Sequence, residues 1–282
     1  MKNLIGILFA LSVLITACKK YAPAPEAFFI KPAYVNVIPS SPSTQGSGSS
    51  KITDLFLYVN GKYQGAYESG NLLPIVSNGE KAELTLFAGI KNNGISETTI
   101  TWLFYNQIKI DTIVESGKTI NRGFTFNYNP AVNFVWMENF DGAGVSLIKS
   151  APTSTVTTLN LINSGESFEN KSAMFELQSN ISLGQFETAI DYALPLGNSN
   201  IYLELNYKCD VELEVGVTDG VTLKNAITLN PKSEWNKIYI QIAEAVNRQP
   251  APATQKIYFR ALNPNQLNAA RVWLDNIKLI TL

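Results

Sequence analysis

Apolar and polar residues alternate with a period of two along most of the chain, which is the pattern of β-strands with one buried face. Residues 53–59 and 62–67 are two such runs joined by Asn60-Gly61, which supplies the positive φ angles of a type I′ turn and predicts a β-hairpin. Short strands separated by Gly-containing turns favour a β-sandwich. Further strands of this kind are predicted at residues 72–76, 82–88, 96–105, 107–114 and 119–126.

The composition breaks twice along the chain. Residues 39–50 read PSSPSTQGSGSS, which is either a flexible linker between domains or a loop between two strands of one sheet. We favour the loop, because the single strand before it could not stand alone. The alternation stops again at residues 127–130, so we predict an all-β protein with an N-terminal β-sandwich at residues 27–127 and a second β-sandwich at residues 131–282.

Two further runs of the second region carry structural predictions. Neither face of residues 271–280 is uniformly polar, so most of this closing strand is predicted to be buried. Cys209 continues an alternation of apolar residues that starts at Ile201, which favours a buried, inert thiol. Residues 242–248 are helix-like and are interpreted as an edge loop with at most one turn of helix.

Three segments of the second region resemble jelly-roll β-sandwiches of carbohydrate-binding modules and galactose-binding-like domains. They are MENFDG at the start, SEWNKIYIQI in the middle and VWLDNIKLI at the end. The resemblance implies a jelly-roll β-sandwich for residues 131–282. It is specific to the architecture and does not identify a ligand. It also implies a possible structural calcium ion between the first and last strands, with Glu138, Asp141 and Asp275 as ligands. The alternative for Asp275 is a buried carboxylate bonded to the backbone.

The first eighteen residues, MKNLIGILFALSVLITAC, have the charged, apolar and small-residue regions of a secretory signal. The apolar run is too short to span a membrane. Ile15-Thr16-Ala17-Cys18 resembles the lipobox of bacterial lipoproteins, which implies that Cys18 is acylated and begins the mature chain. We therefore predict a signal peptide at residues 1–17, a tether at residues 18–26 and a lipid anchor in the outer membrane. An ordinary signal peptide with an incidental cysteine is the alternative.

Two segments of the first region, YVNGKYQGAYESGNLLPI and LTLFAGIKNNGISETTITWLFY, resemble the N-terminal β-domain of lipoproteins common in Bacteroidetes, which implies a cell envelope and no known chemistry. Asp111-Thr112-Ile113 resembles the O-glycosylation acceptor of periplasmic proteins from that phylum, so Thr112 is a candidate glycosylation site. No acidic cluster follows Cys18, which favours the periplasmic face slightly over the cell surface.

Charge and composition exclude several functions. The chain has 22 Lys and Arg residues against 23 Asp and Glu residues, so no basic field attracts nucleic acid. It contains no histidine, which removes Ser-His-Asp and Cys-His catalysis and histidine zinc sites. An enzyme would therefore depend on carboxylates, Lys or Tyr, and we predict that the protein is not an enzyme.

Sugar binding on a β-sandwich uses exposed aromatic rings with polar groups beside them. The four tryptophans lie in strand-like runs, where core packing is the favoured interpretation. Tyr192 and Arg260 lie close to turns and could face a shared groove, so they are the candidate ligand-binding residues, although a structural role is favoured. We predict a non-catalytic envelope lipoprotein that binds a glycan or a protein partner through its C-terminal jelly roll. The competing hypothesis is an accessory subunit of an outer-membrane complex with no small-molecule ligand.

Overall fold

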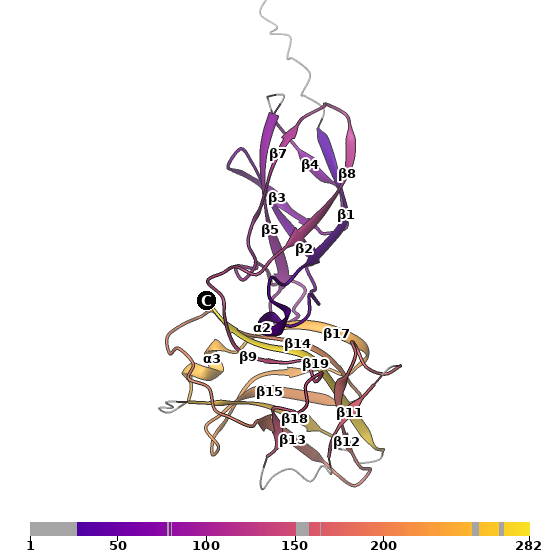
Figure 1. Cartoon of the computed structure of the whole chain (residues 1–282), viewed down its shortest axis with the longest axis vertical. Helices are drawn as coiled ribbons and strands as arrows, with labels where there is room; N and C mark the ends of the chain where they lie inside the picture. The colour runs from indigo at the N-terminus through magenta and orange to yellow at the C-terminus, as the bar shows by residue number, and fades with distance from the viewer. Residues whose placement is uncertain are drawn as a thin grey trace, which may run out of the picture.

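The computed structural model describes residues 27–282 except residues 78, 80, 151–157, 164, 250–253 and 265–267. The predicted signal peptide, the lipidation site at Cys18 and the tether lie outside the described residues. The described chain forms two β-sandwiches stacked along the long axis of the molecule (Figure 1). The prediction of an all-β protein is confirmed. No helix of the described residues is both long enough and apolar enough to span a membrane.

The N-terminal sandwich contains two sheets packed around one apolar core. One sheet has the order β4-β1-β8, with β1 and β8 parallel, and the other has the order β3-β2-β5-β6, with β7 paired to β5. The predicted hairpin is β2-β3, and Asn60 and Gly61 have φ angles of 50° and 74°. The strands are β1 (Phe28–Val37), β2 (Asp54–Val59), β3 (Lys62–Glu68), β4 (Leu73–Ile75), β5 (Lys81–Lys91), β6 (Thr99–Thr101), β7 (Ile108–Ile113) and β8 (Thr119–Phe126).

Two predicted features of this sandwich differ in the structure. The loop at residues 39–50 contains the short helix α2 (Pro42–Gln45) and joins β1 to β2, which belong to different sheets of one sandwich. The loop interpretation therefore placed both strands in the right domain but wrongly in one sheet. The strand expected at residues 96–105 is shortened to β6, because the chain turns after Thr101 and sends its aromatic residues toward the second domain.

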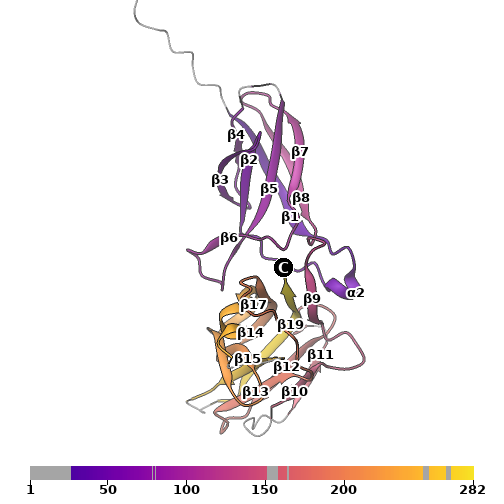
Figure 2. The ribbon, with the colours of Figure 1, turned by 90° about the vertical axis from the view of Figure 1, so that its left-hand side faces the viewer.

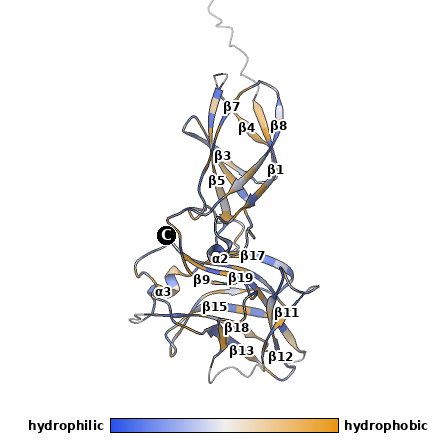
Figure 3. Ribbon diagram, in the orientation of Figure 1, coloured by the Kyte–Doolittle hydropathy of each residue, from blue (hydrophilic) through white to orange (hydrophobic). Residues whose placement is uncertain are grey.

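The C-terminal sandwich also packs two sheets face to face, with the larger apolar core between them. The six-stranded sheet has the order β11-β12-β19-β14-β17, with β9 paired to β19, and it faces the N-terminal domain (Figure 1). The five-stranded sheet has the order β10-β13-β18-β15-β16 and lies on the far side. Hydrophobic residues concentrate on the strands of both sandwiches and hydrophilic residues on the loops (Figure 3).

The strands of the C-terminal sandwich are β9 (Asn133–Glu138), β10 (Leu147–Lys149), β11 (Leu159–Ile162), β12 (Ser172–Leu177), β13 (Leu183–Thr188), β14 (Ile201–Cys209), β15 (Glu212–Thr218), β16 (Leu223–Leu229), β17 (Lys232–Gln241), β18 (Lys256–Leu262) and β19 (Ala270–Thr281). The helix-like segment forms α3 (Ala243–Asn247), a single short helix as expected. Cys209 is buried, as predicted, and burial raises the pKa of its thiol to about 11, which disfavours the reactive thiolate.

The closing strand β19 is buried on both faces, as predicted, for two reasons. A β-bulge at Asn276, which has a φ of 46°, changes the parity of the strand, so that Leu274 before it and Ile277 after it both enter the core. Beyond the bulge the opposite face is covered by the N-terminal domain, where Ile280 joins the apolar core of that domain and the side chain of Lys278 is fully buried.

Aromatic side chains join the two domains. The ring of Trp102, after β6, lies 4.8 Å from the rings of Tyr202 on β14 and Tyr239 on β17. The ring centroids of Phe104 and Tyr202 are 5.4 Å apart, and the hydroxyl oxygens of Tyr105 and Tyr239 are 3.5 Å apart. These contacts bury the part of the outer face of the six-stranded sheet around Tyr202 and Tyr239.

Candidate functional site

A cavity of about 420 Å³ opens where the two domains meet. Figure 2 shows β6 and the turn before it close to the edge strand β17 at this junction. We call this cavity the interdomain cleft, and its walls come from both domains. The N-terminal domain contributes Lys51, Thr53, Lys91, Asn93, Gly94 and Ser96, and the C-terminal domain contributes Tyr207, Ile227, Thr228, Leu229, Asn230, Lys232, Asn236, Lys237, Ile238 and Tyr239.

The turn after β5 is fixed against β17. Asn93 and Gly94 have φ angles of 54° and 70°, which an Asn-Gly pair adopts readily. The backbone N–H of Asn93 donates to the carbonyl oxygen of Tyr239 at 2.9 Å, and the backbone N–H of Gln241 donates to Asn93 Oδ1 at 2.8 Å. A Cβ atom on Gly94 would lie 3.1 Å from Cδ1 of Ile238, so glycine also permits the close approach. This wall of the interdomain cleft is therefore held by the edge of the jelly roll.

Lys51 forms the second connection across the interdomain cleft. Its backbone N–H donates to the Tyr239 hydroxyl at 2.9 Å, and its Nζ donates to Asn236 Oδ1 at 2.6 Å. Burial and the charge of Glu204 raise the pKa of Tyr239, so this hydroxyl stays protonated at neutral pH. Residues of β17 thus hold both Lys51 and Asn93 of the N-terminal domain in place through hydrogen bonds.

A buried charged group lies beneath the interdomain cleft. The carboxylate of Glu204 on β14 has no exposed surface and accepts the Tyr128 hydroxyl at 2.9 Å. Nζ of Lys237 lies 3.3 Å and Nζ of Lys278 lies 4.0 Å from Glu204 Oε2. Lys278 also donates to the backbone oxygen of Ser47 at 2.6 Å, which connects the loop after α2 to the C-terminal sheet. Burial lowers the pKa of Lys278 to about 7.

The polar groups of the interdomain cleft are mainly amides, hydroxyls and ammonium groups. Among its described lining residues, four are lysines and none is acidic. Asparagine side chains supply both donors and acceptors, while Ile227, Leu229 and Ile238 supply apolar surface. This combination suits a small polar ligand with an apolar ring face.

The structure does not bring the two predicted ligand residues together. Tyr192 is buried in the core of the C-terminal sandwich, where its ring stacks on Trp136 with a centroid distance of 6.1 Å. Arg260 lies on the outer face of the five-stranded sheet, over the ring of Tyr258, and its Nε donates to Gln185 Oε1 at 2.8 Å. Arg260 alternates on β18 with the core residues Phe259 and Ala261 and therefore points away from the core that holds Tyr192, so the two side chains do not share a face.

The three predicted calcium ligands each have hydrogen bonds of their own. Glu138 accepts the backbone N–H groups of Phe140 at 2.8 Å and Ser146 at 2.7 Å. Asp141 accepts the side-chain amide of Asn170 at 3.0 Å and the backbone N–H of Lys171 at 3.2 Å. These donors come from the neighbouring loops and give both carboxylates protein partners within hydrogen-bond distance.

Asp275 accepts the Ser172 hydroxyl and the backbone N–H of Asn276, both at 2.7 Å, and burial raises its pKa to about 6. Within the described parts of the chain, no group of three metal-ligating side chains is present. Asp275 is a buried carboxylate bonded in part to the backbone, as the alternative interpretation has it, and the three carboxylates do not form such a group among the described residues.

The tryptophans separate into two groups. Trp102 and Trp136 are buried in apolar clusters, as predicted. Trp273 is buried outside both clusters, under Nζ of Lys208 at 4.2 Å from the ring centroid. Trp235 is partly exposed, so its predicted core position is wrong, and its Nε1 donates to the backbone oxygen of Glu166 at 3.2 Å. The reason is that Trp235 lies near the start of the edge strand β17, beyond the cover of the N-terminal domain.

Thr112, the candidate glycosylation site, lies half-buried on the strand β7. This strand pairs with β5 through the backbone of Thr112 and Ala82. Sequence reasoning missed the residues of the interdomain cleft, although one signal was present: Lys237, Tyr239 and Gln241 alternate with Ile238 and Ile240 on β17. That pattern marks a polar face but does not show that a second domain covers it.

No protein-family model and no curated protein matches the sequence. Among solved structures, the chain is similar to a family 29 carbohydrate-binding module with 11% identity over 54% of this chain and 88% of that chain, at a TM-score of 0.34. A variant of such a module matches with 13% identity over 54% and 85% of the two chains, at a TM-score of 0.36. Another variant, solved in complex with mannohexaose, matches with 11% identity over 54% and 92%, at a TM-score of 0.34. At this level of similarity the ligands of those modules do not transfer to this chain.

Proposed function

We propose that the protein is a non-catalytic, lipid-anchored envelope protein that binds a glycan in the interdomain cleft. The observation that supports the proposal is the cleft itself. Its volume of about 420 Å³ falls in the range of small-molecule sites, and it lies at a domain interface, where such sites often occur. One wall belongs to the C-terminal jelly roll, and the other belongs to the N-terminal domain.

A saccharide fits the chemistry of this lining. Sugar hydroxyls both donate and accept hydrogen bonds, and the side chains of Asn93, Asn230 and Asn236 can do the same. The apolar face of a sugar ring can pack against the aliphatic and tyrosine side chains of the cleft. Glycoside hydrolysis needs two carboxylates facing the bond to be cleaved, and no described lining residue carries one. We therefore assign binding without catalysis.

The lipid anchor places the interdomain cleft away from the membrane. The described chain begins at the end of the N-terminal sandwich that is farthest from the jelly roll (Figure 1). A tether of residues 18–26 reaches at most about 30 Å at about 3.3 Å per residue. An acyl group on Cys18 would hold the N-terminal domain near the outer membrane, with the cleft one domain length farther out.

A glycan array with detergent-solubilised full-length chain tests the binding proposal. Ser96→Trp places a bulky ring at the exposed rim of the interdomain cleft, and Ser43→Trp places the same ring on α2, outside the cleft lining. We expect glycan binding by the wild type and by Ser43→Trp, and its loss in Ser96→Trp. Equal binding by both variants would place the glycan elsewhere, and no binding to any glycan would favour the accessory-subunit hypothesis.

Cys18→Ala tests the anchor. The variant should remain unprocessed or become soluble, because each buried acyl methylene contributes about 0.8 kcal/mol to membrane attachment. Partitioning of the variant into the detergent phase to the same extent as the wild type would contradict the proposed lipidation.

A further inference from the structure

We propose that the ligand of the interdomain cleft is an anionic glycan, whose carboxylate or sulfate group is held by Lys51 and Lys232 above the buried Lys237. This inference rests on the proposed glycan binding and specifies the chemical class of the sugar. It comes from the lysines that line this cleft, two of which have no carboxylate of the described chain within 4.0 Å, although the whole chain carries a formal charge of −1.

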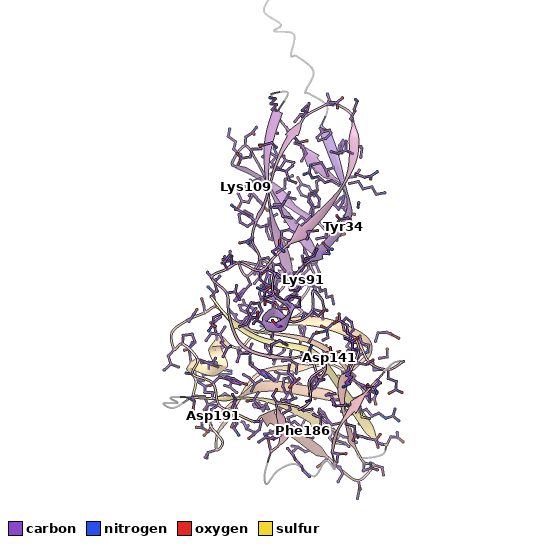
Figure 4. The ribbon with its side chains drawn as sticks, in the orientation of Figure 1. Tyr34, Lys91, Lys109, Asp141, Phe186 and Asp191 are labelled. Atoms are coloured by element: carbon purple, nitrogen blue, oxygen red, sulfur yellow. The ribbon has the colours of Figure 1, made fainter. Side chains whose placement is uncertain are left out.

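Two of the four lysines are matched by carboxylates. Lys91 at the end of β5 pairs with Asp54, with Nζ 3.0 Å from Oδ2, and Figure 4 shows Lys91 at the junction of the domains. Lys237 pairs with Glu204, but Glu204 is also the carboxylate nearest to Lys278. Glu204 is the one carboxylate of the described chain within 4.0 Å of these two buried ammonium groups, while the charges of Glu169 and Asp275 act on Lys237 from farther away.

The other two lysines have no such partner. In the described chain, no carboxylate lies within 4.0 Å of Nζ of Lys51 or Lys232. They approach from different domains, and Lys51 is held by its hydrogen bonds to Tyr239 and Asn236. Partial burial and the positive charge of Lys232 lower the pKa of Lys51, so the two ammonium groups are close enough to repel each other. An anion between them would remove this repulsion.

Lys237 adds an independent observation. Its side chain is only 4% exposed, and it lines the interdomain cleft. Beyond its contact with Glu204 at 3.3 Å, its Nζ has no hydrogen-bond partner among the residues that the structure describes, which leaves N–H groups of the ammonium unused. Buried ammonium groups normally use their donors, since an unused donor in a low-dielectric site is costly. An oxyanion in the cleft would accept this unused N–H group.

The occupant that fits is a charged sugar. Lysine ammonium groups are compact point charges, which suit carboxylate and sulfate groups without selecting between them. The amide side chains of Asn93, Asn230 and Asn236 line the same cleft as the lysines and match the hydroxyl groups of the rest of a sugar ring. A neutral glycan would use the amides and leave the ammonium groups unpaired.

Isothermal titration calorimetry on the full-length chain in detergent tests the inference. The probes are tetragalacturonate, which carries carboxylates, a sulfated chondroitin tetrasaccharide, and neutral mannotetraose. The variants are Lys51→Met/Lys232→Met, the charge-preserving Lys51→Arg/Lys232→Arg, and Lys109→Met as a control on the flank of the N-terminal sandwich (Figure 4). Thermal melts of the free variants report whether the fold is kept.

We expect at least one anionic probe to bind more tightly than mannotetraose. The double Met variant should weaken that binding by about tenfold or more and change neutral binding by less than about twofold, because only charge-assisted contacts are lost. The Arg variant and Lys109→Met should keep the preference. The chondroitin probe carries sulfates beside its own uronate carboxylates, so tighter binding of that probe than of tetragalacturonate shows that sulfate adds to the affinity.

Mannotetraose binding as tight as the anionic probes, with no effect of the double Met variant, would overturn the anionic assignment and leave glycan binding in place. Absence of binding by every probe would overturn both. An equal loss of anionic binding in Lys109→Met would also overturn the inference, because the effect would then come from the overall charge of the protein.

Discussion

Replacing Glu204 by Gln should destabilise the protein strongly, and more at low pH than at high pH. The substitution leaves Lys237 and Lys278 buried opposite a neutral amide. Removing one partner of a buried ion pair costs about 3–5 kcal/mol, because the remaining charge is uncompensated. For a protein of this size each kcal/mol lowers Tm by roughly 2–4 °C, so a fall of roughly 10 °C is expected at pH 6.

The pH dependence follows from the lysine that Glu204 stabilises. The pKa of Lys278 is about 7 in the folded chain, whereas a solvent-exposed lysine has a pKa of 10.5. Between pH 7 and pH 10.5 the unfolded chain therefore binds more protons than the folded chain. Stability of the wild type therefore rises with pH from about 7 toward 10. Burial raises the pKa of Tyr105 and Tyr128, so the folded chain keeps their protons above pH 10 and stability falls again there.

At pH 9, above its folded pKa, Lys278 can release its proton whether or not Glu204 is present. The penalty of Glu204→Gln should therefore be clearly smaller at pH 9 than at pH 6 in thermal melts of both chains. The matched control is Glu176→Gln, since Glu176 pairs with Arg271 at the surface and such pairs contribute less than about 1 kcal/mol. An unchanged Tm for Glu204→Gln at pH 6, or an equal loss at both pH values, would refute this reasoning.

Two further predictions concern the C-terminal sandwich. Gly216→Ala should lower the free energy of unfolding in urea by about 1–3 kcal/mol, because a Cβ atom would lie 2.2 Å from the Lys224 backbone oxygen and 2.8 Å from the Tyr258 ring. The control Gly142→Ala should be nearly neutral, because its Cβ atom would meet nothing closer than 3.7 Å. Similar losses for both variants would contradict the steric argument. Melting curves in EDTA and in millimolar Ca²⁺ should coincide, because Asp275 and the other two candidate carboxylates already have donors, and a stabilising shift of several degrees with Ca²⁺ would show that they bind the ion.

Local pattern was sufficient for the strands. The hairpin at Asn60-Gly61, the strands β5, β7 and β8, the short helix α3 and the buried Cys209 all follow from alternation and turn residues that act within about ten residues. The break in alternation at residues 127–130 lies between β8, which ends at Phe126, and β9, which begins at Asn133. Each of these features leaves a local pattern in the sequence, even where the strand pairs with a distant one, as β8 does with β1.

The candidate site could not be obtained in the same way. A period of two shows that Lys237 and Tyr239 share one face of a strand, but whether water or another domain covers that face depends on the tertiary structure. The contact of Lys51 with Tyr239 joins residues 188 positions apart, and the bulge at Asn276 decides which residues of β19 reach the N-terminal domain. The sequence alone determined most of the strands of the N-terminal sandwich, because alternation and turn residues act locally. The packing of two sandwiches against each other decided where a cleft opens and which charges it leaves unpaired, because both depend on side chains that only the fold brings together.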